Sequence, residues 1–212
     1  MNKYEKEIVV LKKMFGENCI TSALPRLNDI HKHTENIWNN YVGKIPNGKI
    51  NYLLIAESPP WSLDGPPQYV LDPHSRSRTL LSALHKTFIQ DNEGIIKPEE
   101  TINSLANNGF LIADSIPFSM NYLRKRTSKR YEDLVSLTTK SYLLEKLWSE
   151  KLNYSPRLTI AFSVKNNALA ILKALGNKLH INGISCVLGE ELIGVNRAYY
   201  PDAMKLRSIF RL

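Results

Sequence analysis

Two apolar runs stand out from the mixed pattern of hydrophobic and polar positions along this chain. Tyr52–Ala56 and Phe110–Ala113 carry apolar residues without alternation, which is typical of strands buried on both faces of a parallel sheet. Leu158–Phe162 and Ile184–Leu188 are predicted to be the third and fourth strands. In each of the first two strands, polar residues begin directly after the apolar run.

Outside these runs, apolar residues recur at helical spacing over most of the chain. This spacing predicts a helical segment over residues 1–42. Pro25 is expected to break it, and a second helix is expected from about Asn28 to Tyr41. Further helices are predicted from Asp72-Pro73 onward, from Pro98, over about 134–152 and over 164–175. Strands that alternate with helices predict a three-layer α/β/α fold with a four-stranded, mostly parallel sheet.

Size and composition are consistent with one domain over residues 1–212, with residues 1–42 packed on it. The chain has 212 residues and is 43% hydrophobic, which is enough for a sizeable core. It has no run of about 18 apolar residues, so no membrane span is expected. The first residues carry charges of both signs around a short apolar run, unlike a secretory signal. We therefore expect a cytoplasmic protein.

The charge of the chain indicates a polyanionic partner. Lys and Arg number 28 against 20 Asp and Glu, for a net charge of +8. Such an excess also occurs in proteins that do not bind nucleic acids, so charge alone leaves both readings open. Five cations lie within Arg124–Arg130, flanked by Tyr122 and Tyr131, which favours phosphate contact with base stacking over a merely solvated loop. The predicted nucleic-acid-binding residues are Arg76, Arg78, Arg124, Lys125, Arg126, Lys129 and Arg130.

The polar residues after the first two strands are the candidates for chemistry. Because the carboxyl ends of parallel strands meet at one edge of a sheet, Glu57 and Asp114 are expected at the same ligand cleft. Glu57 could orient or deprotonate a water molecule, and Asp114 could accept hydrogen bonds from a ligand. Trp61 and Phe118 could stack on a flat ring. A loop cap, an ion pair or ordinary packing is the alternative for each of them.

Several other classes of site have no support in the sequence. It contains neither Cys-x-x-Cys nor His-x-x-x-His, and its two cysteines lie far apart. A glycine-rich phosphate loop and a Gly-x-Ser-x-Gly nucleophile elbow are also absent. We therefore expect no metal site and no cofactor.

The ordered set of motifs resembles the uracil-DNA glycosylase superfamily over about residues 50–210. In that family the first strand ends in a Gly-[Gln/Glu]-[Asp/Ala/Asn]-Pro motif, to which Ala56-Glu57-Ser58-Pro59 is similar. A later strand that ends in asparagine is matched by Phe110–Phe118, and a third strand followed by a helix by Leu158–Leu175. The family's His-Pro-Ser segment is matched by Tyr200-Pro201-Asp202. The resemblance implies DNA as partner and hydrolysis of the N-glycosidic bond of a damaged or deaminated base.

The resemblance also suggests roles for individual residues. Glu57 would position the water and Tyr200, in place of histidine, would assist the departing base, so both are expected to be catalytic. Ser58, Trp61, Asp114 and Phe118 would bind the substrate. Ser58 stands where some members have aspartate, and Asp114 where the base-reading asparagine stands. An ionised carboxylate only accepts hydrogen bonds, so the preferred base need not be uracil. The iron–sulfur members of the family need four cysteines, and this chain has two, so no cluster is implied.

Two other functions remain open at this point. The departures at Ser58, Asp114 and Tyr200 favour a non-catalytic nucleic-acid-binding module on the same fold. A hydrolase that acts on a small nucleotide or another metabolite is the third possibility. The enzymatic hypothesis requires Glu57, Asp114 and Tyr200 to converge on one cavity.

Overall fold

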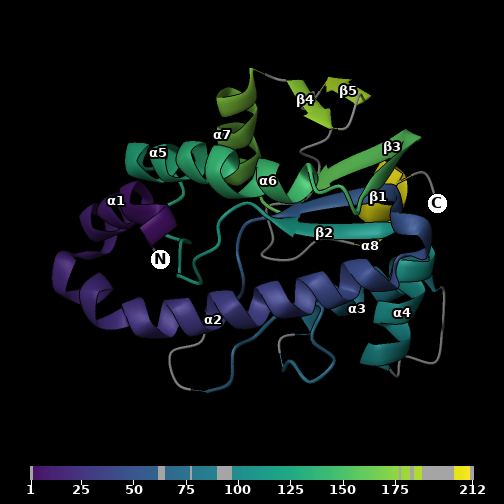
Figure 1. The fold of residues 1–212 in the computed structure, drawn as a ribbon, viewed down its shortest axis with the longest axis horizontal. Coiled ribbons are helices and arrows are strands. Elements are labelled where there is room, and N and C mark those ends of the chain that lie inside the picture. Colours follow the sequence, from purple (N-terminus) through teal and green to yellow (C-terminus); the bar gives the residue numbers. More distant parts are fainter. Residues whose placement is uncertain are drawn as a thin grey trace.

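A three-stranded parallel sheet lies at the centre of the fold, with helices on both sides (Figure 1). The computed structural model describes residues 2–61, 65–76, 78–89, 97–176, 178–181, 184–187 and 203–210. The strand order is β2-β1-β3, with β1 (Lys49–Ala56) between β2 (Phe110–Asp114) and β3 (Asn153–Phe162). Nearly all apolar residues of β1 and β2 are buried, which confirms these two predicted strands.

The fourth predicted strand lies outside this sheet. β5 (Ile184–Val187) pairs antiparallel with β4 (Lys178–Ile181) in a separate two-stranded sheet. Only two residues separate these strands, which suffices for a hairpin but not for the crossover that a parallel neighbour requires. Among the described residues, the parallel sheet therefore has three strands, and the prediction of a four-stranded sheet is not confirmed.

The helices form two groups on opposite sides of the sheet. In Figure 1, α5, α6 and α7 lie on one side, and α2, α3 and α4 on the other. α1 packs against both α2 and α5, and α8 packs against α3 and β3. The bounds are α1 Glu5–Phe15, α2 Glu17–Lys44, α3 Thr79–Phe88, α4 Pro98–Asn107, α5 Lys129–Thr138, α6 Leu144–Leu147, α7 Lys165–Leu175 and α8 Ala203–Phe210.

Helix α2 covers the outer edge of β2. The Trp38 indole N–H donates to the carbonyl of Ile112 at 2.8 Å, and the Tyr41 hydroxyl donates to the carbonyl of Phe110. Residues three apart lie on the same face of a helix. Trp38 and Tyr41 can therefore both reach β2, where the carbonyls of Phe110 and Ile112 point to the same side of the strand. An edge strand left open is a site for unwanted pairing, and α2 protects it with side-chain donors.

Pro25 does not end a helix, contrary to the prediction. α2 is continuous through it, and the break lies earlier, at Gly16, whose φ of 97° ends α1 and begins α2. Pro25 is exposed, so the carbonyl of Thr21, which it leaves without an N–H donor, can bond to water. The buried stripe of Ile20, Leu27 and Ile30 continues past the proline and holds the helix together.

Replacement of this proline is expected to stabilise the protein. Pro25→Ala restores a helical hydrogen bond and removes the ring clash, and part of this gain is offset by greater entropy of the unfolded chain. We expect the free energy of unfolding to rise by about 1–2 kcal/mol in urea titrations. An unchanged or lower value would mean that the packing of α2 depends on the proline ring.

Two predicted helix starts are also wrong. Asp72 begins a turn instead of a helix: its carboxylate accepts from the backbone N–H of His74 at 2.9 Å, and α3 begins only at Thr79. The helix predicted from Leu134 begins five residues earlier, at Lys129, because the Ser128 hydroxyl accepts from the backbone N–H of Tyr131 and caps it. The many cations in this segment favoured an exposed loop, so Ser128 was not recognised as the helix cap.

Candidate functional site at the strand ends

The carboxyl ends of β1 and β2 lie side by side, as the sequence predicted. Ala56 is in register with Asp114, and the backbone N–H of Ser115 donates to the carbonyl of Ala56 at 2.8 Å. The backbone N–H of Ile116 continues the ladder to the carbonyl of Glu57 at 2.9 Å. Glu57 and Asp114 therefore stand at the same edge of the sheet, where open α/β sheets bind ligands.

Glu57 is held by three hydrogen bonds from two side chains. Arg126 donates to it in bidentate fashion, from Nε to Oε1 at 2.7 Å and from a terminal nitrogen to Oε2 at 2.5 Å. The Tyr131 hydroxyl donates to Oε1 at 2.5 Å. A carboxylate has about four acceptor directions, so these contacts leave one, on Oε2. Glu57 is only 8% exposed. The pKa of Tyr131 is raised, mainly by the burial of its own hydroxyl and also by the negative charge of Glu57.

A buried amide connects this carboxylate to a third element. Asn167, in the first turn of α7, exchanges hydrogen bonds with the Ser115 hydroxyl at 2.9 and 3.1 Å. The same hydroxyl lies 3.1 Å from the carbonyl of Glu57. Asn167 also interacts with the Tyr131 phenol. Residues that directly follow β1 and β2, from the segment before α5, and from α5 and α7 thus meet at Glu57, and together they fix its orientation.

Sequence reasoning missed Tyr131 and Asn167 as members of this cluster. Tyr131 was expected to stack on bases together with Tyr122, yet both rings are fully buried and neither can reach a ligand. The signal for Asn167 is its place in the first turn after the third strand, where polar residues can turn toward the strand ends. We name Glu57, Arg126, Tyr131, Asn167 and Ser115 the Glu57 cluster.

Asp114 points away from the Glu57 cluster. Alternation along β1 places Glu57 on the face opposite to Ala56 and its neighbour Asp114. Asp114 interacts with Tyr69, Lys146 and Glu35 instead. Burial raises its pKa from the ordinary value of 3.8 to about 7, against the opposing effect of Lys146. Oδ2 of Asp114 has no hydrogen-bond partner within the described part of the chain.

The two acids therefore share an edge of the sheet without sharing a set of contacts. Glu57 still contributes, as the smallest of several causes, to the raised pKa of Asp114. The expectation that both carboxylates project into one cavity is not met by these contacts, since the period-2 alternation of a strand separates them. Tyr200, the third member of the expected group, lies outside the described residues.

The expected substrate-binding residues differ in how accessible they are. Phe118 is completely buried, with its ring edge-on to Tyr4 at 5.4 Å between centroids, so it is a core residue in this structure. Trp61 is half-buried and packs against the core. The half-buried Ser58 hydroxyl lies 3.4 Å from the carbonyl of Pro59, a weak contact. Ser58 and Trp61 are thus partly open to a ligand, and Phe118 is not.

The basic residues divide into paired and exposed groups. Arg126 is engaged with Glu57, and Lys129 pairs with Asp133 at 3.1 Å. Lys125 is half-buried and lies 5.9 Å from the centroid of the Phe15 ring. The exposed arginines of the predicted set are Arg76, Arg78, Arg124 and Arg130. Arg78 donates to the carbonyl of Ser75 at 3.3 Å, and Arg130 donates to that of Lys13. These four side chains are the most available cations of the predicted set.

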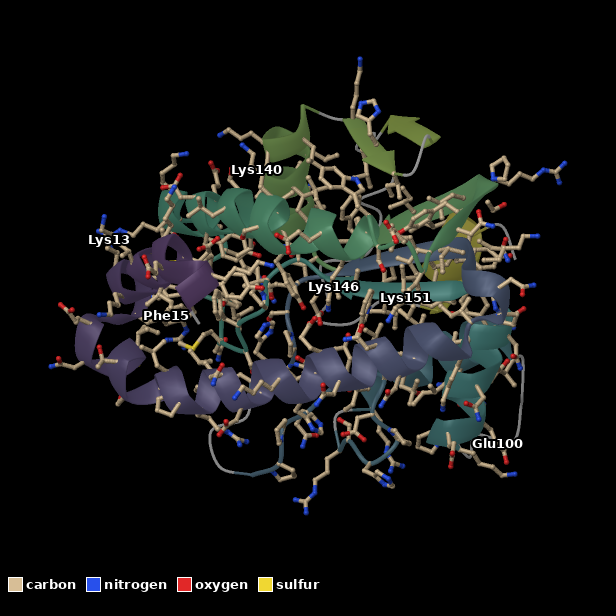
Figure 2. The ribbon with its side chains drawn as sticks, in the orientation of Figure 1. Lys13, Phe15, Glu100, Lys140, Lys146 and Lys151 are labelled. Atoms are coloured by element: carbon tan, nitrogen blue, oxygen red, sulfur yellow. The ribbon has the colours of Figure 1, made fainter. Side chains whose placement is uncertain are left out.

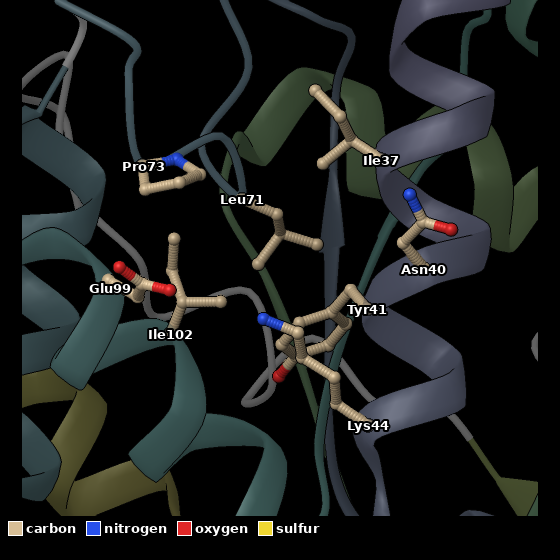
Figure 3. A pocket seen from close by; sticks show the side chains of 8 residues that line it. All are labelled: Ile37, Asn40, Tyr41, Lys44, Leu71, Pro73, Glu99 and Ile102. Carbon is tan, nitrogen blue, oxygen red and sulfur yellow. The ribbon is translucent and has the colours of Figure 1, made fainter.

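A small apolar pocket lies elsewhere, between α2, α4 and the loop around Leu71 (Figure 3). Its volume is about 210 Å³, and Ile37, Leu71 and Ile102 line it. Tyr41, also in its wall, donates to Phe110, the first residue of β2. The pocket is thus at the amino end of that strand, away from the edge where Glu57 and Asp114 stand.

Two further expectations concern metals and membranes. Among the described residues no group of three or more His, Cys, Asp or Glu side chains could hold a metal ion. In the same part of the chain, no helix is both long enough and apolar enough to cross a membrane.

Comparison with known proteins found no match: neither a family model, nor a curated protein, nor a solved structure is significantly similar to this chain.

The hydrogen bond from Tyr131 to Glu57 should contribute measurably to stability. Tyr131→Phe removes a buried donor to a charged acceptor, and we expect the free energy of unfolding to fall by about 2 kcal/mol. Tyr154→Phe is the matched control, since the Tyr154 hydroxyl donates to the neutral carbonyl of Leu147 at 2.9 Å. Urea titration of both variants compares them. A loss for Tyr131→Phe no larger than for Tyr154→Phe would argue against a charged partner.

Proposed function

We propose that this protein binds DNA and hydrolyses the N-glycosidic bond of a damaged or deaminated base. The observation that carries the proposal is the arrangement of Glu57, which is fixed at the carboxyl end of the central strand, where its contacts with other described residues leave one acceptor direction on Oε2. A carboxylate held in this way can accept a hydrogen bond from one water molecule and orient it. The resemblance to the uracil-DNA glycosylase superfamily supports the reaction class.

The reaction needs the base to leave the helical stack. Enzymes that act on a base rotate it out of the duplex into a pocket, at a cost that is lowest for damaged or mismatched pairs. In this proposal the water on Glu57 attacks the anomeric carbon as the C–N bond breaks and the base departs with the bonding electrons. Glu57 accepts the proton that the water loses and the departing base takes it up, so the products are the free base and a sugar hydroxyl. Ser58 and Trp61 would contact the base, and exposed cations such as Arg124 would bind phosphates. The roles of Asp114 and Tyr200 rest on the resemblance alone.

A non-catalytic nucleic-acid-binding module is the second candidate. The bidentate ion pair with Arg126 favours it, because this pair would stabilise the fold even if Glu57 had no part in chemistry. The separation of Glu57 and Asp114 onto opposite faces also favours it. In this case the protein would retain the basic surface and lack turnover.

A base-release assay separates the two candidates. Single- and double-stranded oligonucleotides that contain uracil, hypoxanthine, xanthine or an alkylated base are incubated with the protein, and free base is measured. The proposal expects release from at least one of them. Binding that weakens steeply with salt and is accompanied by no release from any substrate would favour the binding module instead.

A further inference from the structure

Lys146 is a buried lysine that the proposed function does not use. Its side chain is 7% exposed, and it extends from α6 toward α2 (Figure 2). Nζ lies 2.7 Å from Oε1 of Glu35 and 2.7 Å from the Tyr142 hydroxyl. It also lies over two aromatic rings, 4.4 Å from the centroid of Trp38 and 4.6 Å from that of Tyr142. Lysine is seldom buried so completely unless it is paired, as it is here with Glu35.

A pocket opens onto this lysine. Its volume is about 430 Å³, within the range of small-molecule sites in proteins. Tyr4, His31 and Trp38 supply aromatic walls, and the polar groups of Lys146, Glu35 and Tyr142 lie in the same lining. The exposed Lys3 and Glu145 also line this open pocket. Aromatic walls with converging polar groups are a common composition of ligand sites.

The backbone is irregular at this point. Thr139–Leu143, between α5 and α6, is a π-helical turn, and it contains Tyr142. Such turns are rare and occur often at functional sites, because they redirect side chains that a regular helix would place elsewhere. Here the turn brings the Tyr142 hydroxyl to both Lys146 Nζ and Glu35 Oε1, each at 2.7 Å.

We propose that Lys146 forms a Schiff base with a small aldehyde or ketone that enters this pocket. Three observations carry the proposal: the buried amine, the pocket that leads to it, and an acid and a phenol within hydrogen-bond distance. A lysine with lowered proton affinity beside acid–base groups is the arrangement that carbonyl chemistry requires. The proposal is independent of the Glu57 cluster.

Lys146 and Glu35 can carry out every proton transfer that this reaction needs. Lys146 transfers a proton to the Glu35 carboxylate, and the neutral amine attacks the carbonyl carbon to form a carbinolamine. Glu35 returns the proton to the carbinolamine hydroxyl, which leaves as water, and an iminium bond joins Nζ to the former carbonyl carbon. The overall change is ammonium plus carbonyl to iminium plus water, with no oxidant or reductant.

The electrostatic setting is compatible with the first step. Burial lowers the pKa of Lys146 and outweighs the opposite effects of Glu35 and Asp114. The other titratable groups that line the pocket with this amine are Lys3, Tyr4, His31, Tyr142 and Glu145. Burial lowers the pKa of His31 and raises those of Tyr4 and Tyr142. A larger fraction of Lys146 is thus neutral near pH 7 than of an exposed lysine.

Reductive trapping on the wild-type protein tests this proposal directly. The full chain is treated briefly with propanal or butanone and sodium cyanoborohydride at pH 7, and the modified lysines are identified by peptide mass spectrometry. We expect Lys146 to be modified first, several times faster than the exposed Lys140, and to lose this preference in urea. If Lys140 and other exposed lysines react while Lys146 stays unmodified, Lys146 is only a structural cation and the proposal is wrong.

Two variants complete the test. Lys146→Arg keeps a cation beside Glu35 and cannot form an imine, so the fast modification should disappear. Lys140→Arg is the matched control on the same helical segment and should retain it. Persistence of the fast modification in Lys146→Arg would also overturn the proposal. If this variant fails to fold, mapping of the wild-type protein still decides the question.

Discussion

Arg126→Ala is expected to lower the free energy of unfolding by about 3–5 kcal/mol, as removal of one partner from a buried ion pair does. Glu57 is only 8% exposed, and two of its three hydrogen bonds come from Arg126. Without the guanidinium, the carboxylate would keep only the Tyr131 hydroxyl and remain a buried charge without a counter-ion. Urea titration at neutral pH measures the effect.

Arg124→Ala is the matched control. Arg124 is exposed and belongs to the same basic segment, so its removal should change stability by less than about 0.5 kcal/mol and weaken binding to DNA. A double variant with Glu57→Met and Arg126→Met should recover most of the stability that Arg126→Ala loses, because no charge is left buried. Equal effects of Arg124→Ala and Arg126→Ala on stability would show that the ion pair does not form in solution.

The second large effect concerns the pH dependence of stability. Burial raises the pKa of Asp114 from 3.8 to about 7, so between these values the folded state binds more protons than the unfolded state. Stability then falls as pH rises from about 4 to about 7 and is level above that. A shift of about three units corresponds to about 4 kcal/mol.

Asp114→Asn isolates this contribution. The amide does not titrate, so the free energy of unfolding of the variant relative to wild type should rise by about 4 kcal/mol between pH 4 and pH 8. Urea titrations at several pH values give the difference. Asp133→Asn, at an exposed ion pair with Lys129, should show little such change. If the difference in free energy of unfolding between Asp114→Asn and wild type does not change with pH, Asp114 is ionised in the folded protein even at low pH.

Strands β1 and β2 could be predicted from the sequence because a strand that is buried on both faces has an unbroken apolar run. Tyr52–Ala56 and Phe110–Ala113 are apolar without alternation, and both runs are strands that lie side by side. The edge of the sheet where Glu57 and Asp114 stand followed from the parallel arrangement alone.

The errors in the predicted fold arise where tertiary packing or the length of a connection outweighs the local sequence pattern. Pro25 has a strong tendency to end helices, yet the buried stripe of α2 overrides it. The segment Ile184–Val187 has the content of a sheet strand, and its pairing was decided by the short connection to β4.

The contacts of the candidate site were the least predictable part. Arg126 follows Glu57 by 69 residues, and no local pattern marks it as an ion-pair partner instead of a phosphate contact. Lys146 and Glu35 are still further apart in the sequence, and no local pattern marks them as partners either. The direction of each carboxylate depends on a one-residue alternation, which the apolar runs of β1 and β2 do not display.

The central claim is that Glu57 orients the water that releases a base, and the rate of base release under single-turnover conditions tests it most directly. Wild-type protein and Glu57→Gln are compared in excess over a labelled oligonucleotide that carries the best substrate of the base-release assay. Loss of the carboxylate should slow release by about 10²–10⁴-fold with DNA affinity retained. Equal rates for the two proteins, or no release by wild type from any substrate, would contradict it.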